Sequence, residues 1–218
     1  MEILEMMKAR HSVRQYSGKK IESGIRETLT ALVSECNGES GLNIQLIFDE
    51  PKCFDSMMAH YGKFSGVENY IALVGKKGDD LDEKAGYYGE KLVLKAQELG
   101  LNTCWVAMTH GKSAAEIKKG EKLVCIIALG YGATMGTAHQ NKPVDQLCNC
   151  ASDMPEWFAK GMEAALLAPT AMNQQKFYIA LENGKVSARA GKGFYTRMDL
   201  GIVKYHFETV TGRKVESV

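Results

Sequence analysis

The stretch that organises this sequence is AALLAPTAMNQQ, residues 164–175. Its first half is apolar and favours a helix. Pro169 ends that helix, because proline lacks a backbone donor and pushes Ala168 out of the helical region. We expect residues 170–175 to form an exposed turn carrying three side-chain amides. Each amide pairs a donor with an acceptor and suits a planar ligand whose edge alternates N–H and C=O. The alternative is an ordinary polar loop.

A second polar segment, RHSVRQY, occupies residues 10–16. In an extended chain, residues two apart point the same way, so Arg10, Ser12 and Arg14 could meet one anion with two charges and a hydroxyl group. The alternative is an exposed basic stretch without a ligand.

Length and composition limit the class of protein. The 218 residues, 45% apolar and 24% charged, indicate one soluble globular domain. A net charge of +1 argues against binding to nucleic acid or a membrane surface through clustered positive charge. The N-terminus carries acids where a signal peptide needs a basic start, and no run reaches the roughly 18 apolar residues of a membrane span. We therefore expect a cytoplasmic protein.

The six cysteines are dispersed, and Cys148-Asn149-Cys150 is one residue short of the usual C-x-x-C spacing. The five histidines form no metal-binding pattern. We expect free thiols and no metal site.

Hydrophobic periodicity predicts alternating helices and strands, and hence an α+β fold. Helices are expected over residues 1–11, 23–36, 51–61, 81–99, 113–118, 155–168 and 198–210, with Ser23 as a cap and with Phe54, Met57 and Met58 facing inward. Strands are expected over residues 43–48, 70–74, 103–108, 123–129 and 177–181, the last followed by an Asn-Gly turn and the final helix by a polar tail.

Two further features concern organisation. Residues 130–136, GYGATMG, do not match a dinucleotide fingerprint, and we expect their glycines to permit a close backbone approach. A helix, loop and strand at residues 25–48 are echoed at residues 155–181, which suggests two similar half-units about a pseudo-twofold axis.

Four stretches together resemble the flavin-dependent nitroreductase family. RHSVRQY is similar to its R-x-S-x-R-x-[FY] motif, and APTAMNQQ at residues 168–175 is similar to A-P-S-x-x-N-x-Q-P-W. GLNTCWV at residues 100–106 and ALGYG at residues 128–132 resemble its central strands. Two departures stand out: the P-[ST]-x-x-N-x-Q motif lies near the C-terminus, and it ends in Gln-Lys-Phe.

The resemblance implies a single nitroreductase-like domain over residues 1–218, with a mostly antiparallel central sheet flanked by helices and with noncovalent FMN. The residues implied for FMN binding come from four places: the arginine motif (Arg10, His11, Ser12, Arg14), the end of the central strand (Val106, Ala107, Met108), Lys142, and the amide motif (Pro169, Thr170, Asn173, Gln175). The arginine motif would hold the phosphate, with Lys142 as a weaker candidate. The amides of Asn173 and Gln175 would face the isoalloxazine or ribityl group, and the backbone near Val106 would approach the flavin N5 side.

The implied activity is that of an FMN-dependent oxidoreductase taking hydride from NADH or NADPH and reducing an acceptor such as a nitroaromatic or quinone. The flavin performs this chemistry, so no side chain is expected to be a catalytic acid or base. One alternative is a flavin-binding carrier or sensor without turnover. Another is a protein that binds a different phosphate-bearing ligand, such as an acyl-CoA. The late amide motif implies either a monomer with a pseudo-dimeric fold or the family's usual homodimer.

Overall fold

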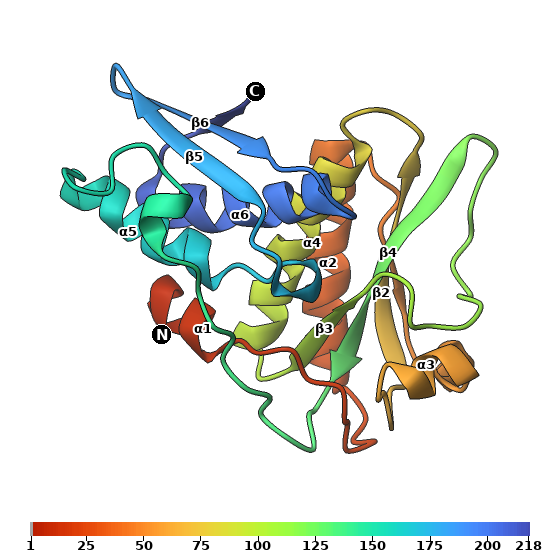
Figure 1. The fold of residues 1–218 in the computed structure, drawn as a ribbon. Coiled ribbons are helices and arrows are strands. Elements are labelled where there is room, and N and C mark those ends of the chain that lie inside the picture. The colour runs from red at the N-terminus through yellow and green to blue at the C-terminus, as the bar shows by residue number, and fades with distance from the viewer. Residues whose placement is uncertain (1) are drawn as a thin grey trace. The chain divides into compact units, whose positions relative to one another are not determined.

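The computed structural model describes residues 2–218 (Figure 1). The chain divides into two units. We call residues 10–81 and 91–138 the central unit, and residues 2–9, 82–90 and 139–218 the terminal unit. Helix α4 (Leu81–Glu98) supplies residues to both.

The central unit is built on a four-stranded antiparallel sheet with strand order β1-β2-β4-β3. The strands are β1 (Gln45–Ile47), β2 (Asn69–Lys76), β3 (Asn102–Val106) and β4 (Glu121–Gly130). Strand β2 is buried along nearly its whole length, as its unbroken apolar run predicts for a central strand. The expected α+β fold with an antiparallel sheet and helices is therefore confirmed.

The helices of the central unit differ in detail from expectation. Helix α2 (Ser23–Ser40) begins at Ser23, but its cap residue is Glu22, and the helix continues to Ser40, where Gly41 ends it in the left-handed conformation. The expected helix over residues 51–61 is two short pieces, η1 (Pro51–Phe54) and α3 (Met57–Tyr61).

Two expectations in this unit are wrong. Met57 and Met58 are 86% and 48% exposed, because Cys53, Phe54 and Ala59 fill the core beneath these short helical pieces. The predicted helix over residues 113–118 does not form. Side chains bind its backbone N–H groups instead: the Tyr70 hydroxyl accepts from Ala114 at 2.8 Å, and Gln45 Oε1 accepts from Glu116 at 2.9 Å.

The terminal unit packs helices against a second, smaller sheet. Its helical segments are α1 (Ile3–Ala9), η2 (Val144–Gln146), α5 (Glu156–Leu167), η3 (Ala171–Asn173) and α6 (Thr196–Thr211). Its strands are β5 (Phe177–Glu182), β6 (Lys185–Ala190) and β7 (Val215–Ser217), in that order. Figure 1 shows β5 and β6 lying over α6. The expected polar tail is wrong in part, since β7 pairs in parallel with β6.

Close packing within the terminal unit depends on small residues and one buried polar pair. A Cβ on Gly86 of α4 would lie 2.0 Å from the carbonyl oxygen of Met198, so only glycine permits this approach. His206 and Glu90, both fully buried, meet at 2.9 Å, and the other ring nitrogen of His206 lies 2.9 Å from the Ala164 carbonyl oxygen. No helix among residues 2–218 has the length and apolar character needed to cross a membrane.

Candidate functional site

The arginine segment runs beside the edge strand β3 of the central unit. Ser12 forms a parallel bridge with Thr103, and the Val13 backbone N–H donates to the Thr103 carbonyl at 3.0 Å. The Arg14 carbonyl accepts from the Ser65 N–H at 3.0 Å. These contacts hold the segment extended, in the conformation that brings alternate side chains to one side.

Arg10, Ser12 and Arg14 all lie close enough to the Cys104 thiol to change its pKa. Burial raises the pKa of this thiol, while the Arg14 charge, a hydrogen bond with the Ser12 side chain and the Arg10 charge all lower it. The structure therefore brings together the two cations and the hydroxyl that the sequence pattern predicted. Cys104 itself was not predicted, although its place on β3 opposite an extended segment is a usable signal.

Two buried polar groups in this region have no protein partner among residues 2–218. They are the guanidinium Nε and Nη1 of Arg10, which is 4% exposed, and the hydroxyl of Tyr16. Burial raises the pKa of Tyr16 well above its usual value. A buried guanidinium with unpaired N–H groups is unfavourable unless an anion satisfies it. The segment therefore fits a phosphate-bearing ligand.

The glycine-rich loop after β4 packs onto the same segment. A Cβ on Gly136 would lie 2.8 Å from both the Cβ of His11 and the carbonyl oxygen of Ser12, and Gly136 has a φ of +68°. The His11 Nδ1 lies 3.2 Å from the Met135 carbonyl oxygen. The predicted close backbone approach is confirmed, and it is made to the arginine segment.

The predicted N5-side residues lie where β3 ends. Val106, the last residue of the strand, is buried; Ala107 is half-buried, and Met108 is 68% exposed. The backbone thus emerges from the sheet into solvent over these three residues.

The amide loop belongs to the terminal unit and has a strained backbone. Helix α5 ends at Leu167, and Ala168 is extended, as Pro169 predicts. Met172, Asn173 and Gln175 have φ values of +52°, +53° and +42°. Residues other than glycine rarely adopt positive φ angles, so the surrounding structure must hold the loop in place.

Hydrogen bonds to Asp199 of α6 help to fix the conformation of this loop. Its two carboxylate oxygens accept from the Ala171 N–H at 2.9 Å and from the Gln174 side-chain amide at 2.7 Å. The Thr170 hydroxyl accepts from the Gln175 N–H at 3.1 Å. Sequence patterns did not predict the contact of Asp199 with this loop.

The Gln175 amide is fully engaged within the terminal unit. Its oxygen accepts from the Lys142 backbone N–H at 2.9 Å, and its nitrogen donates to the Gln140 carbonyl at 2.8 Å and to Asn173 Oδ1 at 2.9 Å. Asn173 is exposed and donates once, to the Gln140 carbonyl at 2.9 Å. Asn173 therefore retains a donor and a lone pair for a ligand, whereas Gln175 fixes the loop.

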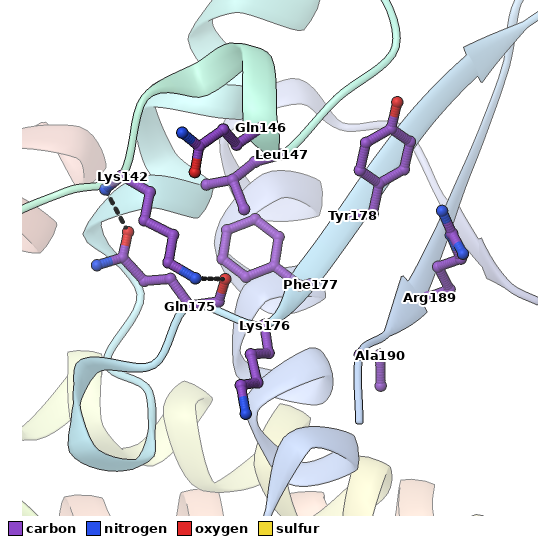
Figure 2. A pocket seen from close by; sticks show the side chains of 10 residues that line it. Lys142, Gln146, Leu147, Gln175, Lys176, Phe177, Tyr178, Arg189 and Ala190 are labelled. Atoms are coloured by element: carbon purple, nitrogen blue, oxygen red, sulfur yellow. Dashed lines mark hydrogen bonds between the residues drawn. The ribbon is translucent and has the colours of Figure 1, made fainter. Parts of the chain in front are cut away.

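The structure divides the predicted site residues between the two units. Those of the arginine motif and the end of β3 lie in the central unit, and Lys142 lies in the terminal unit together with the amide motif (Pro169, Thr170, Asn173, Gln175). Within the terminal unit, Lys142 and Gln175 line a pocket of about 280 Å³ (Figure 2).

Comparison with known proteins supplies a family and a fold. A family model described as "Putative TM nitroreductase" matches residues 2–211. A solved structure from Thermotoga maritima MSB8, described as a "putative nitroreductase", has a TM-score of 0.68 and 23% identity, over 98% of this chain and 87% of that one. No curated protein matches the sequence.

Two further solved structures share the fold at lower similarity. One, from Desulfovibrio desulfuricans, is described as a "putative nitroreductase in complex with fmn"; it has a TM-score of 0.53 and 17% identity over 71% of this chain and 98% of that one. The other is a "Putative NADH dehydrogenase/NAD(P)H nitroreductase" from Bacteroides thetaiotaomicron, with a TM-score of 0.52 and 20% identity over 67% of this chain and 96% of that one.

Proposed function

The chain belongs to the nitroreductase family described above, and from this we propose that it is an FMN-dependent oxidoreductase. It takes hydride from NADPH or NADH and reduces an electron-poor acceptor such as a nitroaromatic or a quinone. It acts in the cytoplasm, where its cysteines would stay reduced, as a monomer with a pseudo-dimeric fold or as a homodimer. The FMN found in the Desulfovibrio relative and the nicotinamide named for the Bacteroides relative support the choice of cofactor and donor.

The observation that carries the proposal is the unpaired, buried guanidinium of Arg10 beside Ser12 and Arg14. An FMN phosphate is a dianion that accepts several hydrogen bonds, and it would satisfy the N–H groups that the protein leaves unpaired. Arg14 is exposed and would contribute a second charge, with the Ser12 hydroxyl as a further donor.

The remaining residues would bind and orient. Asn173, with a free donor and acceptor, would pair with polar edge atoms of the flavin, while Gln175 and Asp199 hold its loop in the strained conformation. Pro169 and Thr170 set the start of that loop, and backbone groups of Val106, Ala107 and Met108 would approach the ring. His11 supports the phosphate segment through its contact with Met135. When bound, FMN supplies the hydride and electron transfer chemistry.

The phosphate assignment is tested by FMN retention. Arg14→Ala removes a charge-assisted hydrogen bond of about 1.5–3 kcal/mol and should raise the dissociation constant for FMN about 10- to 100-fold. Lys142→Ala should have a smaller effect, because the Lys142 Nζ already donates to the Gln174 and Gln175 carbonyls. Lys20→Ala, an exposed cation of the central unit, is the matched control and should change nothing.

Fluorescence titration of the apoprotein with FMN measures these constants. Equal losses in the Arg14 and Lys142 variants, or a larger loss in the Lys142 variant, would remove the phosphate assignment. FMN binding without oxidation of either nicotinamide by any acceptor would make the protein a flavin carrier or sensor instead.

A further inference from the structure

The pocket of the terminal unit is lined by residues that the FMN assignment leaves largely unused (Figure 2). Lys142 and Gln175 meet on one side, while Tyr178 and Arg189 rise from the neighbouring strands β5 and β6 on the other. Lys176 and Phe177 belong to the same lining. All of these residues lie within the terminal unit.

The lining is strongly positive. It contains three cations, Lys142, Lys176 and Arg189, and no aspartate or glutamate. Across residues 2–218, no carboxylate forms an ion pair with any of the three. A concave surface with uncompensated positive charge concentrates anions, and arginine favours phosphate through two parallel N–H donors.

One wall of the pocket is already fixed without a ligand. The Lys142 Nζ donates to the carbonyl oxygens of Gln174 and Gln175 at 2.7 and 3.3 Å, which leaves one of its three N–H donors. The Lys142 backbone N–H holds the oxygen of the Gln175 amide, and Gln175 is only 2% exposed. Little conformational freedom remains to be lost on binding, which favours affinity.

The opposite wall carries an aromatic ring with a guanidinium over it. Tyr178 and Arg189 face each other across the β5–β6 ladder, and the guanidinium carbon lies 5.0 Å from the ring centroid. Phe177 is buried at the base of β5. A guanidinium over an aromatic ring offers a planar cation that can stack on a planar ligand ring and bind a phosphate nearby.

The size of the pocket limits what it can hold. Pockets for whole ligands measure about 300–1,000 Å³, and this one measures about 280 Å³. It is therefore suited to one end of a ligand, such as a phosphate with its sugar or ring, and is too small for a complete dinucleotide.

We propose that this pocket binds the 2′-phosphorylated adenosine end of NADPH, which is a ribose phosphomonoester that carries a planar base. The assignment rests on the proposed function, which provides two ligands with this chemistry, FMN and NADPH. The unpaired guanidinium of Arg10 already accounts for the phosphate of FMN. The pocket accordingly makes NADPH the preferred electron donor over NADH, which lacks this phosphate.

Direct binding to the FMN-loaded protein tests the pocket without turnover. In calorimetric titrations, adenosine 2′-monophosphate should bind at least tenfold more tightly than adenosine. Arg189→Ala should weaken binding of the nucleotide about tenfold or more. Lys176→Ala should weaken it less, because the Lys176 side chain points away from Tyr178 and Arg189 (Figure 2). Lys185→Ala, an exposed cation of β6 outside the pocket, should leave its affinity unchanged.

Steady-state kinetics give a second readout. The Arg189 variant should raise KM for NADPH about tenfold with kcat unchanged. It should raise KM for NADH by a smaller factor, because NADH carries the adenine ring but lacks the phosphate. Failure of the FMN-loaded protein to bind the nucleotide would overturn the proposal. Binding to the apoprotein alone would overturn it as well, because the pocket would then belong to FMN.

The proposed function can fail separately from the pocket. Absence of NADPH oxidation by the wild-type protein would refute the proposed function. The titrations would still decide the pocket: nucleotide binding that depends on Arg189 supports a phosphoadenosine site, and its absence overturns one.

Discussion

Replacing Asp199 with asparagine should change how the stability of the terminal unit depends on pH. Asp199 is 1% exposed and accepts hydrogen bonds from Ala171 and Gln174. Burial raises its pKa from 3.8 to about 6, although both hydrogen bonds act in the opposite direction. The folded protein therefore holds the proton more tightly than the unfolded chain does.

The magnitude follows from the pKa change. A shift of roughly two pH units at about 1.4 kcal/mol per unit corresponds to about 3 kcal/mol. Because the folded pKa is raised, this stabilising contribution is complete below pH 3.8 and is lost as the pH rises through about 6. Asparagine does not titrate. The free energy of unfolding of Asp199→Asn minus that of the wild type should therefore increase by roughly 2.4 kcal/mol between about pH 4 and pH 7, most of the full effect.

Denaturant unfolding at several pH values measures this difference. Trp157 lies on α5 in the terminal unit, so its fluorescence in a Trp105→Phe background reports on that unit. Other titrating groups are common to both proteins and cancel in the difference. A difference that stays constant with pH, or that decreases, would refute the claim that burial of Asp199 disfavours its charged form.

Two further predictions concern packing in the terminal unit. His206→Phe removes the imidazole that hydrogen-bonds to the buried Glu90 carboxyl and should lower the free energy of unfolding by about 3–5 kcal/mol. If urea unfolding shows a decrease of less than about 1 kcal/mol, the His206–Glu90 contact does not stabilise the fold as proposed. Gly86→Ala places a methyl group 2.0 Å from the Met198 carbonyl oxygen and should destabilise by about 1–3 kcal/mol or more. Gly24→Ala in α2, with open space around it, should be neutral or stabilise by up to about 1 kcal/mol, and equal thermal melting of the two variants would contradict the close helix approach.

Local sequence signals predicted most of the elements because each depends on neighbours along the chain. The apolar run of β2, the stop at Pro169 and the Asn-Gly turn between β5 and β6 all lie where the pattern placed them. The predictions that were wrong concern elements whose structure depends on residues distant in the sequence. Residues 113–118 are not helical because Tyr70 and Gln45, far away in sequence, bind their N–H groups. Strand β7 forms because β6 offers it an edge.

In the candidate site, too, features set by neighbouring residues were predictable and features set by distant partners were not. The alternate spacing of Arg10, Ser12 and Arg14 predicted that they share one side of an extended segment, but the contacts with Thr103 and Ser65 that hold the segment extended come from distant parts of the chain. The role of Gln175 was not predictable, because its amide is occupied by Lys142 and Gln140, more than 30 residues earlier in the chain. The hydrogen bond from the Ala171 N–H to Asp199 likewise forms only when α6 packs beside the amide loop. Whether residues 1–218 act as one FMN-binding domain stays a prediction.

The central claim is that the chain binds FMN and passes electrons from a nicotinamide through it. The most direct measurement is the visible absorption spectrum of the freshly purified protein, before and after anaerobic addition of NADPH. We predict a flavin spectrum that bleaches on addition of NADPH and returns on addition of a quinone. A colourless protein that cannot be reconstituted with FMN, or a flavin spectrum that neither NADPH nor NADH bleaches, would contradict the account.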